Sequence, residues 1–205
     1  MNYKQIFKIL EQDHQPTMLE QLKNHSPFQL LIATLLSART KDSTVIPIVK
    51  ELFKKYKTPV DFFNIEIKKL EKLIFKIGFY HVKSKNIQKL SKILIERYNS
   101  EVPSTLDELV NLPGVGRKTA NCILNYVYDK PAIAVDIHVH RISNRLGWVK
   151  TSNELETEQK LMKVLPKKDW KKVNKLFVDH GQRICLPRKP NCNECTIEKY
   201  CQKAI

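Results

Sequence analysis

The sequence predicts an all-α fold, and two kinds of observation support this. Apolar residues recur at the three- and four-residue spacing of amphipathic helices over most of the 205-residue chain, whereas the strict alternation of a half-buried strand is nearly absent. Helix starts are also marked, because Ser26 and Thr58 each precede a proline, which suits the first position of a helix. The segment 27–38 is apolar almost all round, as a central buried helix would be.

Further helices are expected in order along the chain. Pro47 lies inside one amphipathic pattern, so that helix either begins near Pro47 or is kinked there. Gly78 separates two longer amphipathic stretches, and Ser104, with an acid three residues later, predicts a capped short helix. The expected helical segments are 45–56, 58–63, 70–77, 87–98, 104–110, 117–128, 138–146, 153–165 and 170–181.

The charge balance favours a polyanionic partner. The chain has 36 Lys and Arg against 21 Asp and Glu, which gives a formal net charge of +15 and a pI near 9.6. Such a surface attracts nucleic acid in the first place and an acidic membrane surface in the second. No apolar run approaches the roughly 20 residues of a membrane span, and the N-terminal segment lacks the apolar core of a signal peptide. We therefore expect a soluble protein inside the cell, with no membrane partner.

The segment 112–116, Leu-Pro-Gly-Val-Gly, concentrates two of the five glycines of the chain between two expected helices. Gly114 and Gly116 permit a turn with positive φ and leave room for a foreign backbone to come close. The amides of the turn and of the next helix's first residues form a site for an anion such as a phosphate. The alternative is a plain connection between two helices that needs glycine for its own geometry. The basic composition favours nucleic-acid binding.

Two side chains have the chemistry of an active site, one directly after this turn and one eighteen residues further on. Lys118 is expected in the first turn of a helix beside Arg117, where the helix dipole and the neighbouring cation disfavour an ammonium charge and favour a nucleophilic amine. From position alone, a phosphate contact is the more common role for Lys118. Asp136 follows an apolar run and precedes a helix, so it is either an N-cap or a carboxylate that serves chemistry. Spacing does not decide between these alternatives.

Four of the five cysteines lie in the last 21 residues and have the pattern of metal ligands: Cys185, Cys192, Cys195 and Cys201. Four thiolates at this spacing, C-x6-C-x2-C-x5-C, can hold zinc or an iron–sulfur cluster, whereas a redox pair would leave two of them unexplained. Arg188 and Lys189 lie on the loop between the first two cysteines, where they could face a nucleic-acid backbone. Cys122 lies in an apolar pattern and is expected in the core.

With these features the sequence resembles the endonuclease III family of helix-hairpin-helix DNA glycosylases over nearly its whole length. The segments that carry the resemblance are 35–42, 77–87, 112–121, 133–141 and the four-cysteine tail, whose spacing is that family's own. The resemblance therefore implies a [4Fe-4S] cluster rather than zinc. It also implies two domains: a six-helix domain at 20–130, with the helix-hairpin-helix motif at about 104–128, and a cluster domain formed by 1–19 and 131–205.

The resemblance further implies an enzyme of base excision repair. It assigns the catalytic roles to Lys118 and Asp136, in a bifunctional DNA glycosylase and abasic-site lyase that removes oxidised pyrimidines from duplex DNA. The same enzyme then nicks the abasic site by β-elimination through a lysine Schiff base. The damaged nucleotide must be flipped out of the stack, and Phe79 would insert as a wedge where it left; packing of Phe79 at a helix end is the alternative. We expect a monomer that works in the cytoplasm with the nucleoid, if the source is prokaryotic, and otherwise in the nucleus or at an unassigned location.

The chain departs from the family pattern at two positions. Arg39 stands where the family usually has Gln, and because Arg donates but cannot accept, the preference for the base opposite the lesion can differ. Ile137 replaces a small polar residue after Asp136. Two alternatives remain, a non-catalytic DNA-binding module with iron–sulfur or zinc and a mismatch-specific glycosylase of the same superfamily. The residues expected to contact DNA are Arg39, Asp42, Phe79, Leu112, Gly114, Val115, Gly116, Arg117, His138, Arg188 and Lys189.

Overall fold

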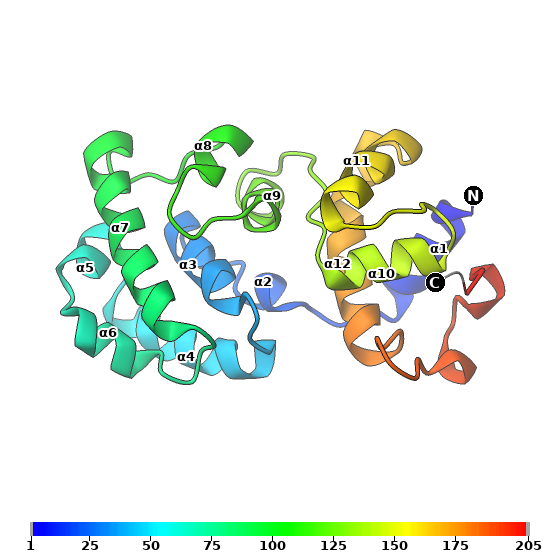
Figure 1. Ribbon diagram of the computed structural model, residues 1–205, viewed down its shortest axis with the longest axis horizontal. Coiled ribbons are helices and arrows are strands. Elements are labelled where there is room, and N and C mark those ends of the chain that lie inside the picture. The colour runs from blue at the N-terminus through cyan, green and yellow to red at the C-terminus, as the bar shows by residue number, and fades with distance from the viewer. Residues whose placement is uncertain (1, 204–205) are drawn as a thin grey trace. The chain divides into compact units, whose positions relative to one another are not determined.

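The computed structural model describes residues 2–203, and the chain divides into two compact units. One unit is continuous, Met18–Asp129, and the other is built from both ends of the chain, Met1–Thr17 and Lys130–Ile205. Every regular element in the described residues is a helix, so the all-α prediction is confirmed (Figure 1).

The unit at 18–129 contains four long and four short helices. The resemblance implies six helices for this part, and the short segments of four to seven residues account for the larger number. The eight are α2 (Met18–Gln21), α3 (Pro27–Ser37), α4 (Asp42–Lys55), α5 (Pro59–Asn64), α6 (Ile67–Leu73), α7 (Tyr80–Tyr98), α8 (Leu106–Val110) and α9 (Arg117–Tyr126).

Capping residues set where these helices begin. Ser26 and Thr58 each accept a hydrogen bond from the third helical residue, whose own side chain bonds back to the cap, so both predicted starts are confirmed. The cap predicted at Ser104 is wrong by one residue, because the side chain of Thr105 accepts from the Glu108 amide. Each hydroxyl residue has an acid three residues later, Asp107 after Ser104 and Glu108 after Thr105, and the structure uses the second pair.

Helix α3 lies at the centre of this unit. Nine of its eleven residues are buried, and it packs against α4, α7 and α9 (Figure 1). Helix α4 begins five residues before Pro47, which lies in its second turn, where the missing N–H removes one helical hydrogen bond. The all-round apolar character of residues 27–38 is therefore explained by burial on several sides.

The second unit has its own core. Phe7, Trp148 and Phe177 pack with ring centroids 5.2–6.2 Å apart, which ties the N-terminal helix to the C-terminal part of the chain. Its helices are α1 (Tyr3–Gln12), α10 (Ile137–Arg145), α11 (Glu154–Val164) and α12 (Trp170–Arg183), with 3-10 turns at η1 (Lys167–Asp169), η2 (Cys192–Glu194) and η3 (Glu198–Tyr200). Among the described helices, none has the length and apolarity that a membrane crossing requires.

Candidate nucleic-acid interface and active site

The hairpin between α8 and α9 uses its two glycines differently. Gly114 has φ of +79°, and a Cβ there would lie 2.9 Å from the Asn86 side chain and 3.2 Å from Leu35. Gly116 has φ of −84° in extended backbone, and a Cβ there would meet nothing within 4 Å. Of the two glycines that permit a turn with positive φ, only Gly114 has one, and the missing side chain of Gly116 keeps the surface open.

The open glycine stands two residues before the expected nucleophile, Lys118. Gly116 is the N-cap of α9 without a side-chain cap, and Arg117 and Lys118 are the first two helical residues, as the sequence predicts. The first turn of a helix presents backbone N–H groups and the positive end of the dipole. Leu112 and Val115 are 3% and 5% exposed, so DNA could reach only their backbone. The hairpin and the first turn of α9 thus combine backbone amides with an exposed Arg117 and a half-buried Lys118, a composition that suits an anion.

Arg39 and Phe79 lie together on two neighbouring loops of this unit. The guanidinium of Arg39 stands 5.5 Å from the centroid of the Phe79 ring, and both side chains are exposed, Phe79 by 60%. Both residues have left-handed backbone, with φ of 57° and 60°. For a residue with a Cβ this conformation costs about 1–2 kcal/mol, so packing around the two loops must hold it. Asp42, three residues after Arg39, is the first residue of α4.

A buried lysine lies beneath the loop that carries Arg39. Lys83 of α7 is 7% exposed, and its Nζ donates to the Leu36 carbonyl at 2.8 Å and to the Ala38 carbonyl at 2.6 Å. Burial lowers the pKa of Lys83 to about 8. Sequence reasoning missed Lys83, although it lies four and seven residues before Ile87 and Leu90, at the spacing of the buried face of its helix.

Asp136, in the other unit, is the N-cap of α10. Its Oδ1 accepts from the amides of His138 and Val139 at 2.9 and 3.0 Å, so the capping role is real. These bonds use one carboxylate oxygen, and the residue is partly exposed. Capping and chemistry are therefore compatible, because Oδ2 takes no part in the cap. Ile137, which follows, is 62% exposed.

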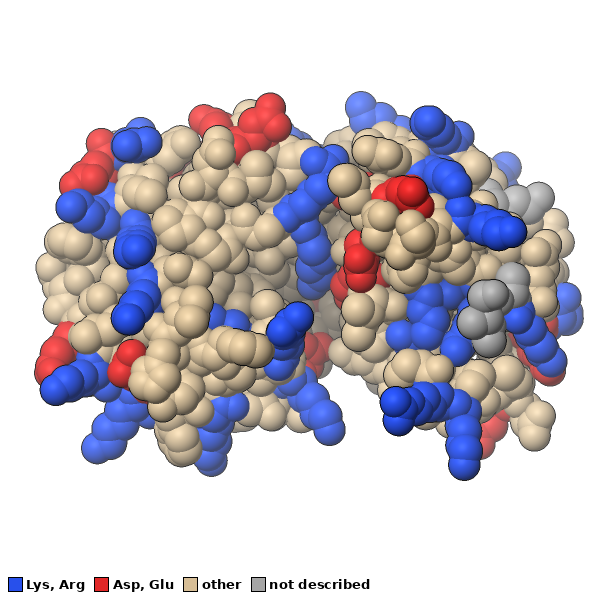
Figure 2. All heavy atoms as spheres, viewed as in Figure 1, with Lys and Arg blue, Asp and Glu red and all other residues tan. Residues whose placement is uncertain are grey.

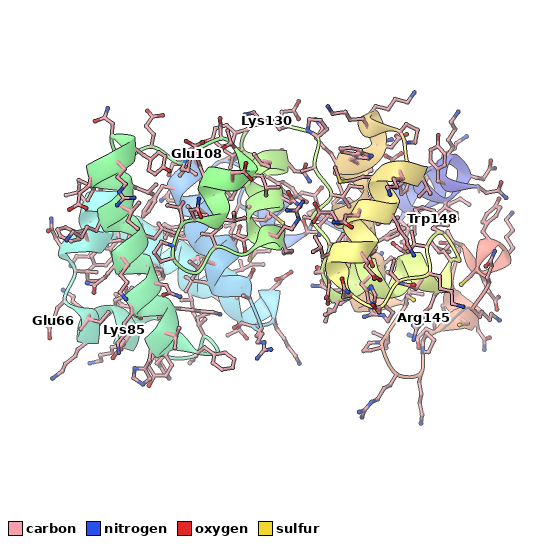
Figure 3. All side chains as sticks on the ribbon, turned by 45° about the horizontal axis from the view of Figure 1, so that its top comes forward. Glu66, Lys85, Glu108, Lys130, Arg145 and Trp148 are labelled. Atoms are coloured by element: carbon pink, nitrogen blue, oxygen red, sulfur yellow. The ribbon has the colours of Figure 1, made fainter. Side chains whose placement is uncertain are left out.

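Two arginines of α10 hold the loop that carries Arg188 and Lys189. Arg141 donates to the carbonyls of Cys185 and Gly181, and its Nη2 lies 3.0 Å from His138 Nδ1. Arg145, labelled in Figure 3, donates to the carbonyls of the next two loop residues, 186 and 187. The His138 ring also packs against α12, where a Cβ on Gly181 would lie 2.6 Å from it.

The four predicted ligand cysteines line one pocket of about 250 Å³. None of the chain's cysteines forms a disulfide, and Cys122 is fully buried in α9, as expected. Across residues 2–203, no three His, Cys, Asp or Glu side chains stand in an arrangement that could hold a metal ion. The cysteines thus share one pocket without forming a ligand shell.

The surroundings of these sulfurs are partly desolvated. Burial raises the pKa of the Cys195 thiol. It lowers the pKa of His180 to about 4. His180 is therefore neutral at pH 7. The two groups are neighbours, with His180 Nε2 3.6 Å from Cys195 Sγ. Arg145 Nη1 donates to Cys185 Sγ at 3.3 Å, and the Lys203 amide donates to Cys201 Sγ at 3.4 Å.

Basic side chains are distributed over the visible face of each unit (Figure 2). Figure 2 shows Lys and Arg spread over both units, with only scattered Asp and Glu. This agrees with the net charge of +15 and gives a backbone of phosphates many possible counter-ions.

The chain is similar to proteins of one family in sequence. The HhH-GPD superfamily of base excision DNA repair proteins matches residues 32–167. A protein named endonuclease III from Thermotoga maritima is 47% identical, over 88% of this chain and 84% of the relative. Another endonuclease III, from Bacillus subtilis, is 43% identical over 99% of this chain and 94% of the relative.

Solved structures agree with these sequence matches. A trapped covalent intermediate of endonuclease III with DNA superposes with a TM-score of 0.85 at 39% identity, covering 99% of this chain and 97% of that one. A thermostable thymine-DNA glycosylase also gives a TM-score of 0.85, at 25% identity, covering 97% of this chain and 92% of that one. The chain therefore belongs to the endonuclease III family of the HhH-GPD superfamily, the DNA glycosylases of base excision repair.

Proposed function

We propose that this glycosylase removes oxidised pyrimidines from duplex DNA and nicks the abasic site by β-elimination, with Lys118 as nucleophile. The observation that carries the proposal is the open N-terminus of α9, where Gly116 leaves space for a phosphate and Lys118 follows within the first turn. A related endonuclease III has been captured as a covalent intermediate with DNA, which supports attack by a side chain of the protein.

The lysine chemistry balances with water as the only added reactant. The neutral amine of Lys118 attacks C1′ of the deoxyribose, and the bond from C1′ to the base breaks as the base leaves with a proton. Loss of the base leaves an aminal at C1′, and its C1′–O4′ bond breaks as O4′ takes a proton from solvent, which opens the sugar ring and gives an iminium at C1′. The iminium accepts electrons from the C2′–H bond when that proton is removed, and the C3′–O bond breaks to release the phosphate. Hydrolysis of the imine then returns the lysine and an unsaturated sugar fragment.

Asp136 would act on the charge that develops at the sugar. A carboxylate near C1′ stabilises positive charge on the sugar as the base departs, or accepts a proton. The cap on α10 fixes the carboxylate through Oδ1, which leaves Oδ2 for this task. Asn at this position would keep the cap and lose the charge, so Asp136→Asn separates the two roles.

Arg39 and Phe79 would fill the gap left by the flipped nucleotide. An exposed aromatic ring can stack with the bases on either side, and the adjacent guanidinium can donate to the acceptor edge of the orphaned base. Because G offers two acceptors to an arginine, we expect a preference for lesions opposite G over those opposite A.

We infer a [4Fe-4S] cluster from the donors that line the cysteine pocket. Its donor set is four sulfurs, and the N–H groups of Arg145 and Lys203 that point at two of them suit the negative charge of thiolate ligands. With four thiolate ligands no iron position is left for water, so the cluster would supply a structural staple. Cys185, Cys192, Cys195 and Cys201 would hold it, and the loop between the first two would present Arg188 and Lys189 to DNA.

We further infer a monomer that acts where the chromosome lies, which in a prokaryote is the nucleoid. A single chain carries both the hairpin and the candidate catalytic carboxylate.

Borohydride trapping tests the proposed chemistry. Duplexes with thymine glycol or an abasic site should give a covalent complex with the protein, and Lys118→Ala should abolish it while the melting temperature is kept. Arg117→Ala is the matched control, since it removes a neighbouring charge and leaves the amine. Equal trapping by Lys118→Ala would contradict the assignment of Lys118.

The alternatives give different results in the same assay. A non-catalytic binding module would show no strand cleavage, and Lys118→Ala would only flatten the salt dependence by about one counter-ion. A mismatch-specific glycosylase would act on undamaged thymine opposite guanine and leave thymine glycol intact. Comparing lesions opposite each base with Arg39→Gln then defines the substrate range.

A further inference from the structure

Lys83 connects the two loops that carry Arg39 and Phe79. Its side chain donates to the carbonyls of Leu36 and Ala38, the latter directly before Arg39. Its backbone amide donates to the Phe79 carbonyl at 3.0 Å, in the first turn of α7. One buried residue therefore holds the end of α3 through its side chain and the start of α7 through its amide.

The end of α3 needs such a partner. The last carbonyls of a helix have no intrahelical donor and carry the negative end of the helix dipole. Ala38 leaves the helix in extended backbone, with φ of −55° and ψ of 120°, and the next residue turns left-handed. A buried cationic donor, such as the Lys83 ammonium, can satisfy two of these carbonyls and also complement the dipole.

A second contact joins the same loops. The Gly78 amide donates to Thr40 Oγ1 at 3.1 Å, and a Cβ on Gly78 would lie 3.1 Å from the Arg39 carbonyl oxygen. The two left-handed residues thus stand on loops that are joined by a bond from backbone to side chain, and their own side chains meet at the surface. The two loops are therefore joined to each other, and Lys83 supports both of them from the buried side.

We propose that Lys83 is a positioning residue that fixes Arg39 and Phe79 in the conformations from which they enter the base stack. This rests on the proposed function of the pair as a wedge. A wedge that is already ordered loses less conformational freedom when it inserts, so more of the binding energy remains to extrude the damaged nucleotide. Lys83 itself never touches DNA.

Single-stranded DNA separates positioning from chemistry. An abasic site in a single strand has no partner base and no intact stack, so the lysine chemistry proceeds there without a wedge. The useful quantity is the ratio of single-turnover trapping rates on duplex and single-stranded abasic oligonucleotides. A 2-aminopurine opposite the abasic site reports whether the wedge has entered, through its fluorescence.

Lys83→Met tests the proposal, because methionine has similar length and no donor. We expect the duplex to single-strand ratio to fall by about 10-fold, with a smaller 2-aminopurine change on binding. Lys83→Arg, which keeps the charge and donors, should recover most of the ratio. Lys85→Met is the matched control, an exposed lysine of the same helix, labelled in Figure 3, and should keep the wild-type ratio.

Three outcomes would overturn the proposal: an unchanged ratio in Lys83→Met, an equal loss on both substrates, or the same change in Lys85→Met. If Lys83→Met does not fold, Thr40→Val removes the acceptor of the Gly78 amide instead, and an unchanged ratio there counts against the proposal. Absence of trapping by the wild-type protein on both substrates would refute the proposed function itself, which keeps the two failures distinct.

Discussion

The hairpin of the unit at 18–129 and the cysteine loop of the other unit both present cations, yet they are held in different ways. Gly114 packs against Asn86 and Leu35, and the neighbouring side chains of the hairpin are buried. Arg188 and Lys189 are exposed, on a loop whose carbonyls are bound by two arginines of α10. The hairpin is positioned by burial. The loop is positioned by hydrogen bonds from the two arginines and, we propose, by the [4Fe-4S] cluster.

The largest effect should follow from loss of one cysteine ligand. Cys195→Ser should remove iron and the broad absorbance near 400 nm, a rough position for thiolate-to-iron charge transfer, and should loosen the loop. The slope of log affinity against log salt should then fall by about 2, one for each of Arg188 and Lys189. Iron analysis and DNA titrations at several salt concentrations measure this.

Cys122→Ser is the matched control, because that cysteine is buried in the unit of the hairpin and should leave iron content unchanged. A colourless wild-type protein with stoichiometric zinc and full activity would show that the loop is held in another way.

The next largest effect is a difference between alanine substitutions at the two hairpin glycines. Gly114→Ala should cost about 2 kcal/mol or more of unfolding free energy, because φ is +79° and the Cβ would meet Asn86. Gly116→Ala should stay within about 0.5 kcal/mol, since its Cβ meets nothing. It should weaken DNA binding roughly 10-fold, the effect of one lost contact of about 1.4 kcal/mol.

Denaturant melts and DNA titrations on both variants decide this. If Gly116→Ala binds DNA as tightly as the wild type, no backbone or phosphate approaches that glycine. The two glycines would then differ only in their contribution to stability, and Gly116 would have no role in DNA binding.

We expect a smaller, pH-dependent effect on the free energy of unfolding from the hydrogen bonds to Asp179 in the second unit. Burial opposes ionisation of Asp179, yet hydrogen bonds from Arg183 and from the Gln15 amide bring its pKa below 3.8. A carboxyl with a lowered folded pKa stabilises the protein above its unfolded pKa, and this contribution is lost as pH falls through the folded value. Asp179→Asn should therefore cost about 2 kcal/mol at pH 7.

Urea melts at pH 7 and below pH 4 test this sign. The difference between Asp179→Asn and the wild type should shrink in acid, because the wild-type carboxyl is then protonated as well. A constant difference at both values would mean that the charge of Asp179 contributes nothing.

Local rules predicted much of this protein correctly. The all-α class, the caps at Ser26 and Thr58, and the start of α9 before Lys118 follow from interactions among residues three or four apart. The cap of the short helix α8 was misplaced by one residue, because Ser104 and Thr105 both have a hydroxyl and an acid at the right spacing. A local rule cannot choose between two such neighbours.

Only the tertiary structure decided how distant segments meet. In the tertiary structure Lys83 is buried against the end of α3, and Arg39 contacts Phe79. The arginines of α10 bind the carbonyls of the cysteine loop. The tertiary structure also separated the two glycines that the sequence treated alike. The sequence by itself determined helices, turns and ligand spacing, since these depend on short-range geometry. Which side chains are buried and paired depends on packing between segments tens of residues apart, and no local pattern contains it.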